Sequence, residues 1–580
     1  MTFTKKFQHT FKTLLVSFVL LVCFCSSSIA AETVAEILFT HDTHCHYSEN
    51  IGFAGVAAIK KDLQSKNPNR KLFLIDLGDA IQGTAYGVFS FGEYSVDIMN
   101  LLHYDIAILG NHAFDYLFPA LVKAVKRSNT KHWLVANLVY TGPGKNPLSM
   151  IKPFTIETVN YGKGKKMKIG FVGVTTPKSI TDGNPRYFMQ DGKFVWSLWG
   201  RGAAQDRFTF YESIQQAINS CRKAGAEMVI LLTHLGTDEN FAPYQSVDLV
   251  HNVTGADLVL DSHSHSVLPR REEKDKSGKI VPITSTGCWL ENVGHVTIYD
   301  DKTAATELIN KKDVTKDGKV VRDEAIQKKI DAIVGQMDKL LSRKVGESEV
   351  TMTRLNEKGE RLSKVAEIPF GNFCADAARY VAGAQIGLMN GGGMKAKIKK
   401  GQLTEKDLFE LYPAVGFLAK IEVTGQQLLD LLEFAYSKTD KYENLHFDPK
   451  SKEPSEENGA FMHVSGLKVV VDSSIPTPVI IENSLFKAIK GKRRVVSVKL
   501  VTDDGKEVPI DPKKTYTAAG NSFGLVSGGD GNTITENCKL LNTISNDHYF
   551  KTYVKYVENF LHGKVSASKY SKPEGRIIVK

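Results

Sequence analysis

The chain has 580 residues, which is too long for one ordinary hydrophobic core and predicts two or more domains. Its hydrophobic content of 42% and charged content of 24% are typical of a soluble globular protein and exclude a disordered chain. The formal net charge is +10, but no basic run is interleaved with aromatic residues, so a nucleic acid polymer is not expected as a partner.

Residues 1–30 predict a signal peptide. Three lysines precede an apolar run at 14–24, and Ser28-Ile29-Ala30 supplies small residues for cleavage before Ala31. The run is too short to span a bilayer comfortably, so a membrane anchor is the less favoured interpretation. We therefore expect a secreted chain with no stable membrane span after cleavage, whose 71 basic and 64 acidic residues leave a net charge of +7.

Cysteine usage does not indicate a disulfide framework. Five cysteines remain after residue 30, an odd number without Cys-x-x-Cys spacing. They are Cys45, Cys221, Cys288, Cys374 and Cys538. A single bridge in an oxidising compartment stays open.

The hydrophobic pattern predicts two domains and a connecting helix. Over residues 31–322, strand-like apolar runs alternate with helical stretches up to about residue 300, and the polar segment 301–322 indicates the edge of this α/β domain. Apolar residues at helical spacing over 323–344 predict a helix that joins the domains. From 345 to 580 the pattern is α+β, and the polar stretch 439–459 within it predicts a long surface loop.

Five apolar runs in the N-terminal half end in Asp, Asn or His. Asp42 and His44 follow 37–40, Asp79 follows 72–75, Asn111 and His112 follow 106–109, His234 ends 228–233, and Asp261, His263 and His265 follow 258–260. A single His after a strand is most often structural, but five such strand ends in order are not expected by chance. Because ligands bind beyond the carboxyl ends of strands in α/β sheets, these side chains predict a metal site.

Two divalent ions fit this set better than one. The candidate ligands are Asp42, His44, Asp79, Asn111, His234, His263 and His265. One ion takes about four to six ligands, so seven are too many for a single site. Asp79 lies in a tight Gly-Asp turn and is suited to bridging two ions. Zinc, manganese, iron and cobalt all accept such ligands.

Five motifs in the N-terminal half resemble those of the calcineurin-like metallophosphoesterases. They are Asp42-x-His44, Gly78-Asp79-x-x-Gln82-Gly83, Gly110-Asn111-His112, Thr233-His234-Leu235-Gly236 and Ser262-His263-Ser264-His265. The resemblance is closest to the secreted 5′-nucleotidase branch, which includes bacterial periplasmic UDP-sugar hydrolases. It continues through the segments Phe370–Ala377, Asn390–Lys395, Val464–Leu467 and Gly528–Gly531.

The resemblance implies an α/β fold with an N-terminal four-layer αββα metallophosphoesterase domain, a linker helix and a C-terminal α+β 5′-nucleotidase-type domain. It also implies the metal sites. Asp42, His44, Asp79 and His265 would hold one ion, and Asp79, Asn111, His234 and His263 the other. His112 would face the phosphoryl group and the leaving oxygen, with Asp115 orienting its ring, since an imidazole needs a partner that fixes its tautomer. The compartment it implies is the bacterial periplasm.

The resemblance places a substrate site on the C-terminal domain. The matching positions are Lys364, Asn390, Gly392, Lys395, Phe523 and Asp530. Lys364 and Lys395 stand where the family has Arg, which keeps the charge but loses bidentate phosphate contacts. Ala414 replaces one of the two base-stacking Phe residues, and Phe523 lies one position from the expected place of the second, near Gly524. We therefore expect weak discrimination among bases.

The expected function is metal-dependent hydrolysis of phosphate esters, foremost of nucleoside 5′-monophosphates to nucleoside and phosphate, by a metal-bridging hydroxide. The alternatives within this class are a broad-specificity phosphomonoesterase, a 2′,3′-cyclic-nucleotide phosphodiesterase and a nucleotide-sugar hydrolase. A metal- or nucleotide-binding protein without turnover is the alternative from another class. The neighbouring His112 and Asp115 argue against it.

Overall fold

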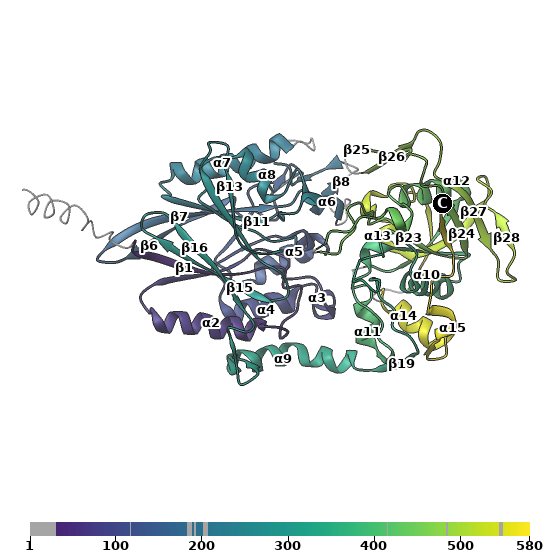
Figure 1. The fold of residues 1–580 in the computed structure, drawn as a ribbon, viewed down its shortest axis with the longest axis horizontal. Helices are drawn as coiled ribbons and strands as arrows, with labels where there is room; N and C mark the ends of the chain where they lie inside the picture. Colours follow the sequence, from purple (N-terminus) through teal and green to yellow (C-terminus); the bar gives the residue numbers. More distant parts are fainter. Residues whose placement is uncertain are drawn as a thin grey trace, which may run out of the picture.

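The computed structural model describes residues 31–116, 118–182, 188–190, 193–200, 207–413, 416–449, 451–482, 485–544 and 549–580. The predicted signal peptide and Ala414 lie outside these residues. Figure 1 shows two domains of mixed α/β structure side by side, joined by the long helix α9 (Glu324–Leu341). Within the described residues, no helix has both the length and the apolar character that a membrane crossing needs.

The N-terminal domain contains two six-stranded sheets. The first has the order β16-β15-β1-β2-β3-β4, formed by Ala304–Asn310, Asn292–Tyr299, Thr33–Thr40, Lys71–Asp76, Ile106–Ile108 and His132–Leu134. The second has the order β13-β14-β12-β11-β7-β6, formed by Val267–Lys274, Ile280–Thr286, Leu258–Leu260, Met228–His234, Lys165–Thr175 and Phe154–Tyr161. The central strands β1, β2, β3 and β4 are parallel, as are β7, β11, β12 and β14.

Three hydrophobic cores make this domain a four-layer αββα sandwich, as predicted. Phe39 of β1 and Ile230 of β11 lie in the core between the two sheets. The opposite face of the first sheet, including Leu38, packs with helices α2 (Gly52–Lys66), α4 (Glu93–Leu102) and α5 (Phe118–Arg127). Helices α7 (Arg207–Lys223) and α8 (Ser246–Asn252) cover the second sheet. Strands buried on both faces have continuous apolar runs, which is why the sequence revealed them.

The segment 301–322 is more regular than its composition indicated. Strand β16 pairs antiparallel with β15 and forms an edge of the first sheet, and β17 (Thr315–Lys316) pairs with β18 (Lys319–Val320). The side chains of β16 are half-buried or exposed, so an edge strand of this kind has a polar sequence. The prediction of a merely polar domain edge was therefore incomplete.

Helix α9 is anchored in both domains. The carboxylate of Asp323 accepts a hydrogen bond from the Ile326 amide (3.1 Å) and caps the helix. Ile330 and Val334 pack into the core of the N-terminal domain, whereas Leu341 packs into that of the C-terminal domain. The helix predicted over 323–344 thus begins and ends within three residues of the expected positions.

The C-terminal domain is α+β, as predicted. Its five-stranded sheet has the order β23-β20-β29-β22-β30, formed by Met462–Ser465, Ile386–Asn390, Thr515–Asn521, Leu418–Thr424 and Lys539–Ile544. Helix α10 (Pro369–Ala382) has Pro369 in its first turn, where a residue without a backbone N–H is tolerated. Helix α12 (Gly425–Ala435) begins with a capping box between Thr424 and Gln427. All five cysteines predicted for the mature chain are free thiols.

Candidate metal centre and cleft

The seven predicted metal ligands lie together where the two sheets meet. Asp42 and His44 follow β1, Asp79 follows β2, Asn111 begins the turn after β3, His234 ends β11, and His263 and His265 follow β12. Two groups have ligand atoms that all lie within 4.8 Å of one another. One comprises Asp42, His44 and His265, and the other comprises Asp79, His234 and His263. The strand ends therefore bring together the side chains that the sequence singled out.

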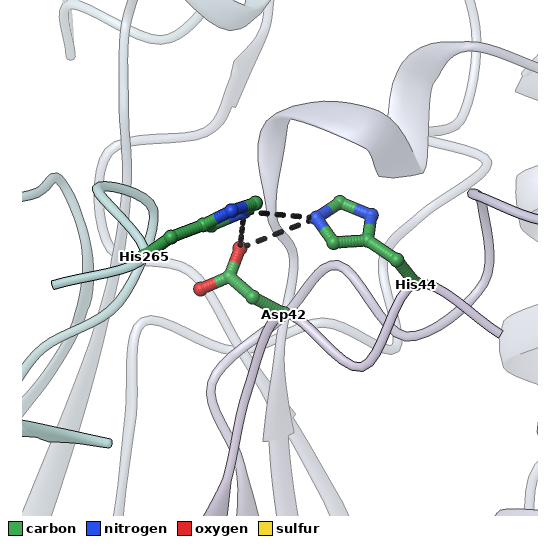
Figure 2. A group of neighbouring side chains, drawn as sticks. All are labelled: Asp42, His44 and His265. Carbon is green, nitrogen blue, oxygen red and sulfur yellow. Dashed lines mark hydrogen bonds and ion pairs between the residues drawn. The ribbon is translucent and has the colours of Figure 1, made fainter. Parts of the chain in front are cut away.

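Asp42 lies at the centre of the first group, as Figure 2 shows. Its Oδ1 atom is 3.6 Å from Nε2 of His44 and 3.4 Å from Nε2 of His265. The same oxygen is buried without a hydrogen-bond partner among the described residues. Its Oδ2 atom is 2.7 Å from Nδ1 of His41 and accepts a hydrogen bond from the His263 amide (2.9 Å). An unpaired buried carboxylate oxygen among imidazoles suits a cation.

Acceptor atoms of two other residues lie close to Nε2 of His234. Its Nδ1 atom donates to the Leu77 carbonyl (2.8 Å), which leaves Nε2 facing Oδ1 of Asn111 (3.0 Å) and Oδ2 of Asp79 (3.1 Å). Burial alone would lower the pKa of His234, but the charges of Asp79 and Asp42 outweigh it and raise the pKa to about 9. Without a metal ion, a proton on Nε2 of His234 would be shared with the oxygens of Asn111 and Asp79. A divalent ion bound by these three atoms would replace that proton.

The backbone around these ligands is strained. Five of them have positive φ angles although they are not glycine: Asp42, His44, Asp79, His263 and His265. Such conformations cost on the order of 1–3 kcal/mol each and cluster at functional sites. The tight turns after the strands direct the side chains into the site at the expense of backbone stability.

His112 and Asp115 form a pair beside the metal ligands. Nδ1 of His112 lies 2.7 Å from Oδ2 of Asp115, and the backbone amide of His112 donates to Oδ1 of Asp79 (3.0 Å). His112 also forms a group with His44 and Asp79 whose ligand atoms lie within 4.8 Å of one another. Because Asp115 engages Nδ1, Nε2 is the atom that His112 presents to a ligand.

A cleft of about 2350 Å³ extends from this centre to the C-terminal domain. It is lined by all six predicted substrate-binding residues: Lys364, Asn390, Gly392, Lys395, Phe523 and Asp530. The Asn390 amide donates to Oδ2 of Asp530 (3.0 Å). Burial lowers the pKa of Lys395 to about 8, with further contributions from the charges of Lys364 and Arg354. Lys395 is therefore an ammonium group in a site that lacks water to solvate it.

Phe523, a predicted substrate-binding residue, and further aromatic residues line the cleft. Phe523 lines the cleft and Gly524 does not. Phe417 lines it as well, and its amide donates to Oγ of Ser522 (3.2 Å), directly beside Phe523. Tyr412 is only 1% exposed, and its hydroxyl donates to Oδ1 of Asn390 (2.7 Å), so its ring forms part of the floor. Phe417 and Phe523 are thus neighbouring aromatic residues that line the cleft and could contact a flat ligand.

His41 is a residue whose role the sequence did not reveal. Its Nε2 atom accepts a hydrogen bond from the Thr286 amide (2.8 Å), so Nδ1 carries the proton and donates to Oδ2 of Asp42. The main-chain carbonyls of Gln82 and Leu77 similarly fix the rings of His44 and His234. The signal for His41 was its position directly before Asp42, but its partner is 245 residues away.

Comparison with known proteins agrees with this architecture. A family model of the 5′-nucleotidase C-terminal domain matches residues 344–537, and one of the bacterial capsule synthesis protein PGA_cap matches residues 72–280. The snake venom 5′-nucleotidase of Crotalus adamanteus is 24% identical over 88% of this chain and 84% of its own length. The trifunctional nucleotide phosphoesterase protein YfkN of Bacillus subtilis is 23% identical over 86% of this chain but only 32% of its own length.

A solved structure has the same fold over nearly the whole chain. The 5′-nucleotidase precursor from Thermus thermophilus superposes with a TM-score of 0.68 at 24% identity, covering 94% of this chain and 99% of the other. The chain thus has the two-domain fold of this 5′-nucleotidase, and its residues 344–537 match the 5′-nucleotidase C-terminal domain family. The clustered His and Asp residues lie in the N-terminal domain of that fold.

Proposed function

We propose that the chain is a secreted, metal-dependent phosphomonoesterase that converts nucleoside 5′-monophosphates to nucleoside and phosphate. The observation that carries this proposal is the convergence of acceptor atoms on two points beside the His112–Asp115 pair. The names of its relatives, a 5′-nucleotidase and a nucleotide phosphoesterase, support the substrate class. We assign catalysis to residues 31–322, the connection to 323–344, substrate recognition to 345–580 and export to 1–30.

The donor set fits two divalent ions. Asp42, His44, Asp79 and His265 would hold one, and Asp79, Asn111, His234 and His263 the other. The orphaned Oδ1 of Asp42 and the two acceptors around Nε2 of His234 support this assignment. When bound, two such ions supply charge neutralisation of the phosphoryl oxygens and an activated water. Zinc, manganese, iron and cobalt are all compatible with these ligands.

His112 acts on the leaving group in this proposal. Asp115 holds its ring through Nδ1, so Nε2 is oriented toward the phosphoryl group near Asp79 and His44. A protonated Nε2 would donate to the oxygen of the leaving alcohol as the ester bond breaks. The amide of His112 donates to Oδ1 of Asp79, so the turn that carries the proposed acid His112 also positions the proposed metal ligand Asp79.

The C-terminal domain recognises the rest of the substrate in this proposal. Lys395 and Lys364 contribute positive charge to the phosphate, and the paired Asn390 and Asp530 offer polar atoms to the sugar. Phe523 offers a ring to the base. This division leaves the chemistry to one domain and the selectivity to the other.

One panel of assays tests the proposal. Purified protein, stripped of metal and reloaded with each candidate ion, is given AMP, a cyclic nucleotide, a nucleotide sugar and p-nitrophenyl phosphate. Release of phosphate from AMP supports the proposal, and fastest hydrolysis of the nitrophenyl ester would favour a broad phosphomonoesterase. Binding of nucleotide without turnover of any ester would instead identify a binding protein. Activity only in capsule synthesis, the name of the family matched by residues 72–280, would overturn it.

A further inference from the structure

The segment predicted as a surface loop contains a hairpin that lines the cleft. We call the described residues 446–449 and 451–457 the acidic hairpin. Its two arms are held by hydrogen bonds from the Ser455 amide to the His446 carbonyl (2.7 Å) and from the Asp448 amide to the Glu453 carbonyl (2.9 Å). The Phe447, Asp448, Glu453 and Glu457 side chains all line the cleft. The predicted polar surface loop over 439–459 is mostly exposed or half-buried in its described residues, and part of it faces the cleft.

Asp448 of the acidic hairpin and Asp238 of the N-terminal domain line the same cleft. Burial raises the pKa of Asp238, and the charge of nearby Asp448 raises it further. The hairpin is also fixed to its own domain, because the Arg361 amide donates to the Lys452 carbonyl (3.0 Å). Its last arm continues into Gly459, whose carbonyl accepts from the Gly392 amide (3.1 Å). The hairpin thus borders the glycine turn at the proposed substrate site.

Two glutamates of the hairpin neutralise cations of the cleft. Glu457 contacts Nζ of Lys364 through Oε1 and Nη2 of Arg361 through Oε2, both at 2.5 Å. Glu453 makes a further ion pair with Arg361. All four side chains are between 15% and 32% exposed, so water screens these pairs only in part. Two positive charges that face the cleft are thereby matched by two negative ones.

Lys395, unlike Lys364 and Arg361, has no carboxylate partner among the described residues, where it forms no ion pair within 4 Å. Lys364, Arg354, Arg361 and Asp115 contribute to its electrostatic surroundings and line the same cleft. Arg354 likewise forms no ion pair among the described residues, and its Nη1 atom donates to the Met394 carbonyl (3.4 Å). Near Lys395, the cleft thus has a cation without a matching carboxylate, Arg354, and two cations that the glutamates neutralise, Arg361 and Lys364.

We propose that Glu453 and Glu457 are specificity determinants that restrict the cleft to substrates with a single phosphoryl group. This inference rests on the proposed function. A second phosphoryl group, as in a nucleoside diphosphate, would add negative charge to the cleft that Glu453 and Glu457 also line. There it would have to displace the glutamates or lie against them, and like charges in close contact disfavour the wrong partner. A monophosphate would bring only one phosphoryl group, which Lys395 and the proposed metal centre would hold.

A competing account makes the glutamates positioning residues that hold Lys364 and Arg361 ready for substrate. The two accounts predict opposite signs. If the glutamates exclude charge, their neutralisation frees two cations and strengthens binding of diphosphates. If they position the cations, their neutralisation weakens binding of every phosphate ester.

The test uses the metal-loaded full chain with Glu453→Gln, Glu457→Gln and the double variant. Glu456→Gln is the matched control, since it removes the same charge from an exposed position on the same hairpin. The readouts are kcat/KM for ADP and AMP, and the dissociation constants of inorganic pyrophosphate and phosphate by calorimetry. We expect the double variant to bind pyrophosphate about tenfold more tightly relative to phosphate, and to raise the ADP-to-AMP ratio of kcat/KM by a similar factor.

The inference is overturned by unchanged ratios in folded variants, by weaker binding of both anions, or by an equal shift in Glu456→Gln. Thermal melting verifies folding. If Glu457→Gln does not fold, Glu453→Gln alone decides, because among the described residues Glu453 pairs with Arg361 only. Absence of AMP hydrolysis by the wild type would count against the proposed function, while the pyrophosphate measurement still decides this inference.

Discussion

The Nε2 atoms of His44 and His265 lie 3.1 Å apart, and His44 presents a lone pair in this contact. Burial lowers the pKa of His44, so its ring is neutral, and its single proton is on Nδ1, which donates to the Gln82 carbonyl (2.9 Å). Its Nε2 therefore faces His265 and the orphaned Oδ1 of Asp42 as an acceptor. A cation between these three atoms would satisfy all of them at once.

The first prediction concerns metal content. Purified protein should hold about two divalent ions per chain, and Asp79→Asn should lose ions and activity, because Asp79 is proposed to serve both sites. Elemental analysis after gel filtration measures this. Asp115→Asn is the control, since Asp115 lies in the cleft but is not a proposed ligand, and it should retain both ions. Full activity at one ion per chain, with Asp79→Asn harmless, would refute the two-ion assignment.

The second prediction concerns His112. His112→Ala should lower kcat by roughly 10²–10⁴-fold, the usual contribution of a positioned acid or base, while the metal content stays unchanged. Steady-state kinetics together with elemental analysis check both parts. His112 lies within 4.8 Å of ligand atoms of His44 and Asp79, so a direct ligand role is the alternative. Loss of an ion in the variant would establish that alternative and remove the acid role.

The third prediction concerns the base. Stacking of a base on an aromatic ring contributes about 1–3 kcal/mol, which corresponds to roughly ten- to a hundredfold in binding. Phe523→Ala and Phe417→Ala should each raise KM for AMP by up to this amount. Glycerol phosphate, which has no ring, is the internal control and should be hydrolysed as before. If Phe417→Ala leaves the KM for AMP unchanged, Phe523 is the only one of the two rings that stacks on the base. That result would agree with the sequence, in which Ala414 replaces one of the two stacking Phe residues.

The fourth prediction concerns pH and His463, a fully buried residue of the C-terminal domain. Its Nε2 donates to the Ser363 carbonyl (2.9 Å), and its Nδ1 is buried near Gly371 with no hydrogen-bond partner among the described residues. Burial lowers its pKa from 6.5 to about 4, so the unfolded chain binds more protons between these values. The free energy of unfolding therefore keeps its full contribution from the neutral His463 above pH 6.5. About 3 kcal/mol of this contribution is lost as the pH falls to 4.

His463→Gln should reduce this pH dependence, because glutamine can still donate to Ser363 but does not titrate. Thermal melting of the C-terminal domain within the full chain, recorded between pH 7 and pH 4, gives the comparison. His562→Asn, at an exposed position, should melt with the pH dependence of the wild type. Parallel curves for His463→Gln and wild type would show that other groups cause the loss.

The N-terminal half of the molecule was largely predictable because its strands are buried on both faces. Runs such as 228–233 are apolar without interruption and end in a residue that stays polar, which marks both the strand and the site. Contacts between distant segments were not predictable in this way. The role of His41 depends on Thr286, and the place of the acidic hairpin depends on Arg361 and Lys364. A polar segment has the same composition whether its charged side chains face open solvent or a cleft, so composition alone does not predict which of the two it faces.

The proposed ligands belong to both halves of the sandwich. Asp42, Asp79 and Asn111 follow strands of the first sheet, whereas His234, His263 and His265 follow strands of the second. Ions held by both sets would cross-link the sheets, and an ion present at about a hundred times its dissociation constant stabilises the folded state by about 2.7 kcal/mol. Metal loading would then complete folding as well as catalysis. If residues 1–30 direct export, as proposed above, the chain would reach its full stability only in a compartment that supplies the ions.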